Sequence, residues 1–204
     1  MNGFLFILIL VAIYLIGAIP TGIVLARIMG YQDVRGHGSG NIGATNVYRV
    51  AGKLPGLLTL LGDILKGWLP LMIYQVWLAP TPAQLGFASV AAIVGHCYPI
   101  YLKFKGGKGV ATALGIFLVL SPQAVLGAAL IFAFTVATTR FISLGSILAA
   151  LSAPLWILLL DAPEPILLAT FFIAALIVWR HRSNIRRLLD GREDRFKARG
   201  KSES

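Results

Sequence analysis

Long unbroken apolar runs dominate this sequence, and they restrict its fold more than any other feature. The first run, residues 4–24, contains no charged side chain, and further apolar runs recur as far as residue 179. A helix needs about 20 apolar residues to cross the hydrocarbon of a bilayer, whereas exposed elements of soluble domains alternate apolar with polar residues. The pattern therefore predicts an all-α integral membrane protein.

The composition agrees with this class of protein. Only 13% of the residues are charged, compared with roughly 25% in soluble domains. The net charge of +10 would suggest nucleic-acid binding in a soluble protein, but here the aromatic residues lie in the apolar runs and not among the basic residues. We therefore exclude a nucleic-acid partner. The uncharged N-terminal stretch lacks the basic start of a secretory signal, and we interpret it as a retained first span.

Seven segments are predicted to cross the membrane: 4–24, 54–78, 84–102, 110–120, 124–139, 142–160 and 165–179. The stretch 109–139 allows either two short helices around Ser121-Pro122 or one long kinked helix. With two helices, the Lys and Arg residues share one side, provided that the Lys66 side chain reaches back to the interface. Because Lys and Arg accumulate on the cytoplasmic side, we expect seven spans, with the N-terminus outside and the C-terminus cytoplasmic.

The segment 110–120 is short for a full crossing, so we expect its helix to begin inside the preceding glycine-rich stretch, or the bilayer to thin there. The whole chain, 1–204, is predicted to form a single transmembrane domain. Its basic end, 181–204, is interpreted as a cytoplasmic tail that fixes the orientation and touches anionic lipid.

The first polar cluster is GHGSGNIGATNVYR, residues 36–49. Its four glycines in eight residues allow successive backbone N–H groups to point at one anion. The polar side chains among and behind these glycines are Ser39, Asn41, Thr45, Asn46 and Arg49. The forked guanidinium of Arg49 suits a phosphate group. A plain turn does not need such groups packed so closely, and we therefore predict a phosphate-binding loop.

Gly38, Gly40 and Gly43 also match the dinucleotide-binding fingerprint, and Asp63 follows Gly43 by 20 residues. That fingerprint requires a preceding strand and a surrounding βαβ unit. Here the glycines follow a predicted span and Asp63 lies inside the next one, so we reject a dinucleotide site.

The second polar cluster is KFKGGKG, residues 103–109, directly before a predicted helix. Helix N-termini with flexible glycines bind phosphate through free N–H groups and the helix dipole, and Lys108 supplies a positive charge. The glycines around it are Gly106, Gly107 and Gly109. A topology-determining basic loop explains Lys103 and Lys105, but it does not explain these glycines. The stretch is not a Walker loop, because Gly109 stands where Ser or Thr is required.

The third cluster has two pieces, residues 140–146 and 180–184. Ser143 and Ser146 are three residues apart, as are His181 and Asn184, so each pair can face inward from one helix side. In the seven-span topology, the second, fourth and sixth predicted helices all start on the side that holds the clusters. Their positive dipole ends converge there, which favours binding of more than one phosphate-bearing ligand.

Four motifs in order resemble the bacterial acyl-phosphate-dependent glycerol-3-phosphate acyltransferase family, known as PlsY. They are GSGNIGATNVYR at 38–49, GHCYPIYLKFKGGKGVAT at 95–112, RFISLGSI at 140–147 and HRSN at 181–184. The resemblance implies transfer of a fatty acyl group from acyl phosphate to the 1-position hydroxyl of glycerol 3-phosphate. The products are lysophosphatidic acid and phosphate, in the first step of phospholipid synthesis.

The same resemblance implies that neither acyl-CoA nor acyl carrier protein serves as donor, and that no metal or other cofactor is needed. It places the chain in the bacterial cytoplasmic membrane with its active site facing the cytoplasm. The expected partners are acyl phosphate, glycerol 3-phosphate and the lipid bilayer. Contact with the enzyme that produces acyl phosphate is left open.

By this resemblance, the catalytic residues are Arg49, Lys108, Ser146 and His181. The substrate-binding residues are Ser39, Gly40, Asn41, Thr45, Asn46, Gly106, Gly107, Gly109, Ser143 and Asn184. Glycerol 3-phosphate is expected on Arg49, Lys108, His181 and Asn184. Acyl phosphate and its developing oxyanion are expected on Ser39, Thr45 and Ser146, together with loop amides.

No Ser-His-Asp set can be assembled from the motif residues, because the motifs contain no Asp or Glu. The proton of the attacking hydroxyl therefore goes either to His181 or to a substrate phosphate, and both remain open. A rival hypothesis is a transporter of organic phosphates, which would place polar residues near the bilayer midplane and not at one face. A structural lipid-binding protein would have no use for two phosphate loops.

Overall fold

The computed structural model describes residues 2–196, and within that range all regular secondary structure is helical. The α-helices are α1 (Gly3–Gly17), α2 (Thr21–Ile28), α3 (Ala44–Ala51), α4 (Lys53–Leu78), α5 (Pro82–Cys97), α6 (Val110–Leu120), α7 (Pro122–Thr139), α8 (Ile142–Leu159), α9 (Glu164–Arg180) and α10 (Arg182–Leu189). Two 3-10 turns, η1 (Val34–Gly36) and η2 (Ile100–Leu102), lie in the connections. The predicted all-α class is confirmed.

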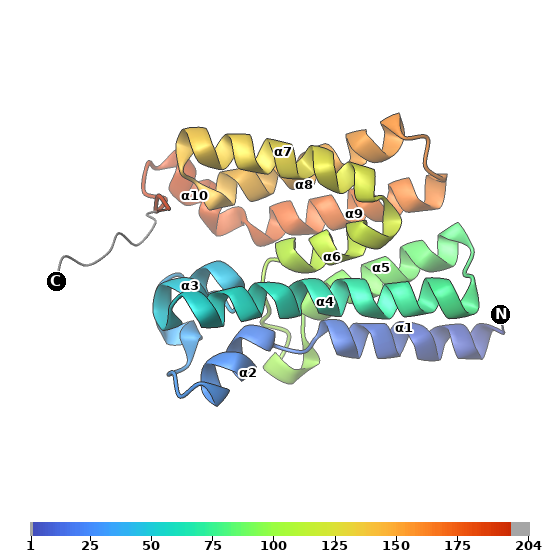
Figure 1. The fold of residues 1–204 in the computed structure, drawn as a ribbon, viewed down its shortest axis with the longest axis horizontal. Coiled ribbons are helices and arrows are strands. Elements are labelled where there is room, and N and C mark those ends of the chain that lie inside the picture. Colours follow the sequence, from blue (N-terminus) through green and yellow to red (C-terminus); the bar gives the residue numbers. More distant parts are fainter. Residues whose placement is uncertain (1, 197–204) are drawn as a thin grey trace.

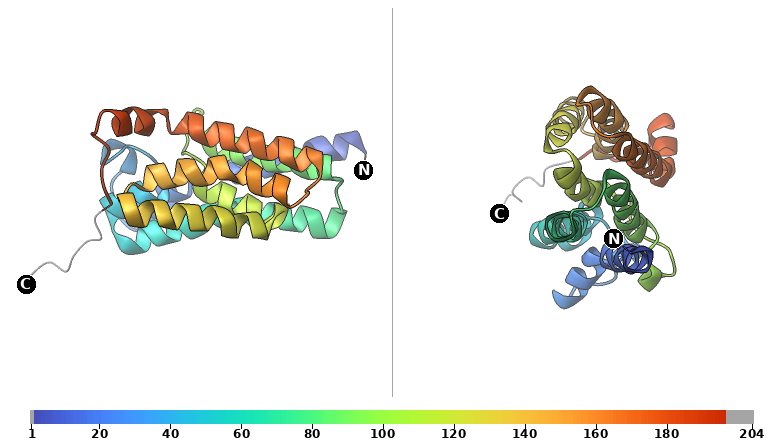
Figure 2. Two further views of the ribbon diagram at one scale, coloured as in Figure 1. Left: turned by 90° about the horizontal axis from the view of Figure 1, so that it is seen from above. Right: turned by 90° about the vertical axis from the view of Figure 1, so that its right-hand side faces the viewer.

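The long helices run side by side along one axis, and the short helices α2, α3 and α10 gather at the end of the bundle away from the N-terminus (Figure 1). Figure 2 shows the same arrangement from above and along the helix axes. We call this end the loop end, because it holds the segments 29–43, 103–109 and 190–196. The part of the predicted basic tail beyond residue 196 lies outside the described residues.

Four helical segments are individually long and apolar enough to cross a membrane, namely α4, α7, α8 and α5 with its extension to Leu102. Two bent pairs bring the number to as many as six: α1 with α2, at 45°, and α9 with α10, at 56°. The helix α6 is a shorter apolar segment of 11 residues. The described residues therefore hold between four and six candidate spans.

The outer surface and the helix crossings fit a lipid environment. Large apolar side chains such as Trp77, Leu130 and Phe134 are 81%, 72% and 73% exposed, which a bilayer tolerates. At the α1–α5 crossing, a Cβ on Gly17 would come within 2.4 Å of the Ala92 carbonyl oxygen. At the α4–α6 crossing, a Cβ on Gly115 would meet a backbone carbonyl at 2.1 Å. Glycine at these positions lets the helix backbones approach closely, as is common in membrane bundles.

The ambiguous stretch 109–139 forms two helices. The first ends at Leu120, Ser121 accepts a hydrogen bond from Ala124 N at 3.2 Å, and Pro122 begins α7. The helix α7 then runs back toward the loop end beside α8 (Figure 1). At its other end, α6 begins at Val110, immediately after the glycine-rich stretch and not inside it.

The first predicted span and the position of Lys66 differ from the sequence-based expectations, and a break in the first helix explains both. The first predicted span, 4–24, breaks after Gly17, and the break leaves the Ile19 carbonyl outside any helix. Lys66 donates a hydrogen bond to that carbonyl at 2.8 Å and pairs with Asp63 at 2.8 Å. The Lys66 side chain is therefore buried inside the bundle instead of extending to an interface.

Candidate active site

One cavity of about 780 Å³ opens at the loop end and continues between the helices. Its apolar part is lined from α4, α6, α7 and α8 by residues that include Leu57, Leu60, Leu114, Phe117, Ala128, Phe132, Ala150 and Ala153. Its polar part is lined by residues that include Ser39, Asn41, Thr45, Arg49, Lys53, Asp63, His96, Lys108, Ser143, Ser146, His181, Asn184, Arg187 and Glu193. The first turns of α4, α6 and α8 all contribute to this lining, which is the convergence of helix starts that the sequence predicted.

The side chain of Asn46, which is 1% exposed, holds the backbone of the first loop in place through hydrogen bonds. Its Oδ1 accepts a hydrogen bond from Ser39 N at 2.8 Å. Its Nδ2 donates to the backbone carbonyls of Val34, His37 and Asn41, at 2.9, 3.2 and 2.9 Å. The amide group of Asn46 is thus engaged by the loop, which gives this residue a supporting position next to the cavity.

Two glycines of the first loop have left-handed backbone angles, with φ of +60° at Gly38 and +69° at Gly40. Such angles favour glycine because other residues are strained there. Behind the loop, Thr45 and Arg49 lie one turn apart on α3 and both line the cavity. The Arg49 guanidinium forms an ion pair with Asp194 at 3.5 Å.

The second loop packs against the end of α5. Gly106 N donates to Cys97 O and Gly107 N donates to His96 O, both at 3.2 Å. From α9, Arg180 donates to the carbonyls of Gly107 and Gly106 at 2.9 and 2.6 Å. The N–H groups of these two glycines therefore bond within the protein. The amides at the start of α6 remain as the helix-terminal donors, since the first N–H groups of a helix have no intrahelical partner.

The three glycines of this loop meet different local requirements. A Cβ on Gly106 would lie 2.2 Å from His96 O, and one on Gly107 would lie 2.2 Å from His96 Nε2. Gly109, the N-cap of α6, has a left-handed φ of +86°. Close approach and backbone geometry thus explain why the sequence repeats glycine around Lys108.

The ammonium group of Lys108 points at the last motif. Its Nζ donates to Asn184 Oδ1 at 2.5 Å. Burial lowers the pKa of Lys108 to about 8, although the nearby Glu193 acts in the opposite direction. The group is therefore still largely charged at neutral pH. The structure thus joins the second predicted cluster directly to the third.

Glu193 is a site residue that the sequence analysis missed. Its carboxylate accepts hydrogen bonds from Ser143 Oγ at 2.6 Å, Asn184 Nδ2 at 2.6 Å and Arg187 Nε at 2.7 Å. Burial acts to raise the pKa of Glu193, but these hydrogen bonds outweigh it and hold the pKa below its usual range. The motifs contain no carboxylate, yet the fold supplies one from the chain after α10. Its sequence signal is an acidic residue in an otherwise basic tail.

His181 and Ser146 both line the cavity. One polar atom of each side chain forms a hydrogen bond to a backbone carbonyl of the preceding helical turn. His181 Nδ1 lies 2.8 Å from the Ile177 carbonyl oxygen, which only accepts hydrogen bonds. The neutral ring therefore carries its proton on Nδ1 and leaves Nε2 as an acceptor. Burial lowers the pKa of His181 to about 4, so the ring is neutral at physiological pH. Ser146 Oγ donates to Ile142 O at 2.9 Å.

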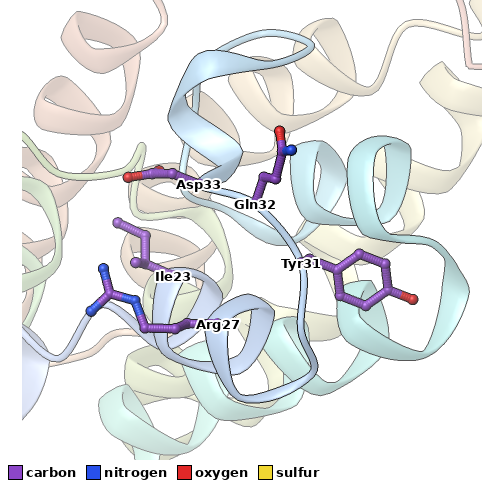
Figure 3. Close-up of a pocket in the computed structure, with 5 residues that line it drawn as sticks. All are labelled: Ile23, Arg27, Tyr31, Gln32 and Asp33. Carbon is purple, nitrogen blue, oxygen red and sulfur yellow. The ribbon is translucent and has the colours of Figure 1, made fainter.

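A second, much smaller cavity of about 50 Å³ lies beside α2 and is lined by Ile23, Arg27, Tyr31, Gln32 and Asp33 (Figure 3). It contains none of the predicted site residues. Across residues 2–196, no group of three His, Cys, Asp or Glu side chains is placed to hold a metal ion. The large cavity is therefore the candidate active site.

Fold and cavity together define a class: an all-helical membrane protein with cationic and hydrogen-bonding side chains at the mouth of an apolar groove. The family model described as glycerol-3-phosphate acyltransferase matches residues 7–191. This chain belongs to that family, as its four motifs predicted.

Curated relatives carry the same description. The glycerol-3-phosphate acyltransferase of Syntrophotalea carbinolica is 57% identical over 193 residues, which cover 95% of this chain and 98% of the relative. The one from Geobacter sulfurreducens is 51% identical over 199 residues, covering 94% of this chain and 98% of the relative. The similarity thus extends over nearly the full length of both proteins.

Two solved crystal structures of PlsY, described as an integral membrane glycerol 3-phosphate acyltransferase, also match. The glycerol 3-phosphate form has a TM-score of 0.89 at 42% identity and covers 94% of this chain and 96% of its own. The lysophosphatidic acid form has a TM-score of 0.87 at 41% identity and covers 94% and 95%. Together with the apolar helices, these matches show that this chain is a multi-pass membrane protein.

Proposed function

We propose that this protein transfers a fatty acyl group from acyl phosphate to the 1-position hydroxyl of glycerol 3-phosphate, giving lysophosphatidic acid and phosphate. The observation that carries the proposal is the large cavity, in which a polar mouth leads into an apolar groove. Both proposed substrates contain a phosphate group: glycerol 3-phosphate is a phosphate ester, and acyl phosphate is a mixed anhydride that carries the acyl chain. The solved relatives, named for glycerol 3-phosphate and lysophosphatidic acid forms, support the same acceptor and product.

The polar mouth offers two groups of phosphate ligands. Arg49 from α3 and Lys108 from the second loop are two of the cations that line it, together with Lys53 and Arg187, and Asn184 lies beside Lys108. We assign glycerol 3-phosphate to these side chains and to His181. The acyl phosphate is assigned to Ser39, Thr45 and Ser146, with its chain in the groove between α4, α6, α7 and α8.

The reaction needs orientation more than an activated protein nucleophile. The hydroxyl oxygen of glycerol 3-phosphate attacks the acyl carbonyl carbon and forms the ester bond. The bond between that carbon and the phosphate oxygen breaks, and inorganic phosphate leaves with the electron pair. Because the mixed anhydride already has a good leaving group, positioning of the two substrates supplies much of the catalysis.

The hydroxyl proton is assigned to a substrate phosphate. The pKa of His181 is about 4, whereas the second pKa of a phosphate monoester is about 6. The phosphate of glycerol 3-phosphate, which is a monoester, is therefore the stronger base. His181 Nε2 instead accepts a hydrogen bond from a hydroxyl of glycerol 3-phosphate.

The proposed topology has seven spans, with α6 crossing a thinned part of the bilayer or stopping short within the bundle. The N-terminus lies outside, and the active site faces the cytoplasm of a bacterial inner membrane. This is supported by the basic residues at the loop end, among them Arg49, Lys53 and Arg140, and by Asp161 and Glu164 as the charges of the α8–α9 turn. Cysteines placed near Thr81 and Pro163 should react with impermeant reagents from outside, and cysteines near Lys53 and Arg140 should not.

The activity is tested by incubating the purified protein with acyl phosphate and glycerol 3-phosphate. Lysophosphatidic acid and inorganic phosphate should form in equal amounts. The same protein in sealed vesicles tests the rival hypothesis, since a transporter would move radiolabelled glycerol 3-phosphate across the membrane without any acyl donor. Such transport without product formation would overturn the proposed reaction.

A further inference from the structure

A second polar cluster lies inside the bundle, and the sequence analysis did not anticipate it. Its members are Asp63 on α4, His96 on α5 and Thr112 on α6, which are 3%, 3% and 0% exposed. Two of these members, Asp63 and His96, also line the large cavity. A hydrogen bond of 2.9 Å joins Thr112 Oγ1 to His96 Nδ1, and Asp63 Oδ1 lies 3.8 Å from the same ring nitrogen. Three neighbouring helices therefore meet at one imidazole ring.

Lys66 stabilises the cluster by forming an ion pair with Asp63. The ammonium group of this residue lies 2.8 Å from Asp63 Oδ1 and donates to the Ile19 carbonyl. A buried carboxylate is costly unless it is paired and hydrogen-bonded, and Lys66 meets this need for Asp63. The ring of His96 thus lies beside the Asp63–Lys66 ion pair and is not an isolated polar group in an apolar core.

His96 contacts both ends of the segment that contains Lys108. Its backbone carbonyl accepts the Gly107 N–H at 3.2 Å, and its Nε2 lies where a Cβ on Gly107 would come within 2.2 Å. Its Nδ1 bonds Thr112 in the first turn of α6, four residues after Lys108. Between these two contacts, the chain has to present Lys108 and the first amides of α6 to the cavity.

We infer that His96 is a positioning residue which, through Thr112 and Gly107, fixes the segment 107–112 so that Lys108 faces the substrate phosphate. The inference rests on the proposed function of the cavity. We assign the ring no contact with the substrate: although His96 lines the cavity, its Nδ1 is bonded to Thr112 and its Nε2 lies against Gly107. Its effect on the reaction passes through the position of Lys108.

Thr112→Val is the most specific variant, since it keeps the shape of the side chain and removes the hydroxyl that bonds His96. We expect the KM for glycerol 3-phosphate to rise about three- to tenfold, as for the loss of one buried hydrogen bond, with little change in kcat or in Tm. Thr112→Ser keeps the hydroxyl and should restore the KM. Ser89→Ala is the matched control, because this buried hydroxyl of α5 bonds only within its own helix, to Leu85 O.

Hydrogen exchange supplies a readout that does not depend on activity. The amides of residues 106–112 should exchange faster in Thr112→Val and in His96→Leu than in the unchanged protein, with Ser89→Ala unchanged. If the unchanged protein fails to turn over acyl phosphate, the proposed function fails, and the exchange rates alone decide the positioning role. Unchanged KM and exchange in Thr112→Val would overturn the inference, as would a lower Tm with an unchanged KM.

Discussion

The two glycine-rich loops of the active site look alike in sequence but are built in different ways. In the first loop, Gly38 and Gly40 adopt left-handed angles around one buried side chain, Asn46, which makes four hydrogen bonds to the loop. In the second loop, Gly106 and Gly107 are needed because the backbone and ring of His96 leave no room for a Cβ. Glycine thus serves backbone conformation at Gly38 and Gly40, and also at Gly109 of the second loop. At Gly106 and Gly107 it serves close packing.

The difference shows what glycine spacing can and cannot predict. It identifies a loop that approaches a ligand or another backbone closely. It does not identify which of the two occurs, nor which N–H groups are free. In the second loop the amides of the two central glycines bond to α5, so the charge of Lys108 and the start of α6 remain to bind an anion.

The largest effect is expected from removing that charge. Lys108→Ala should lower kcat/KM for glycerol 3-phosphate about ten- to a hundredfold, because a charge-assisted contact is worth about 1.5–3 kcal/mol. Steady-state kinetics in detergent or nanodiscs measures this. Lys105→Ala is the matched control, since Lys105 is exposed on the same loop and should retain nearly full activity. Equal activity of the two variants would break the assignment of the second loop to phosphate.

A methyl group added to each loop sharpens the comparison. Gly107→Ala should destabilise the protein by about 1–3 kcal/mol, as overpacking does, and should raise the KM as the ring of His96 is displaced. Gly36→Ala, at the start of the first loop, should be silent, because a Cβ there meets nothing within 4 Å. Thermal unfolding followed by fluorescence compares the two variants. A stable, fully active Gly107→Ala protein would show that close packing does not explain the second loop.

The smallest of these effects is a dependence on pH. In the proposed function, Lys108 binds phosphate as the ammonium ion. Burial lowers the pKa of Lys108 to about 8, so this form predominates below pH 8 and is lost above it. We expect kcat/KM to fall about threefold between pH 7.5 and 8.5, since deprotonation halves the competent form at the pKa. Lys108→Arg, if active, should lack this fall because arginine stays charged. An identical alkaline fall in Lys108→Arg would assign the titration to another group.

The sequence predicted the all-α class, the family and the convergence of Lys108, Asn184 and Ser143 on one cavity. These features depend on local patterns: apolar runs, glycine spacing and pairs three residues apart on a helix. The part played by Glu193 was not predictable in this way, because its partners lie on other helices and in a tail that composition marks as basic. The same holds for His96, Asp63 and Thr112, which meet only after three helices have packed.

The choice of acyl donor tests the central claim most directly. The purified protein should be given glycerol 3-phosphate with either palmitoyl phosphate or palmitoyl-CoA at equal concentration, and lysophosphatidic acid and inorganic phosphate should be quantified together. In the proposed reaction, a compact phosphate binds beside Lys108 and an acyl chain lies in the adjoining groove. We therefore expect turnover with palmitoyl phosphate, one phosphate released per product, and no turnover with palmitoyl-CoA. Comparable turnover with palmitoyl-CoA, or product formation without phosphate release, would contradict the proposed reaction.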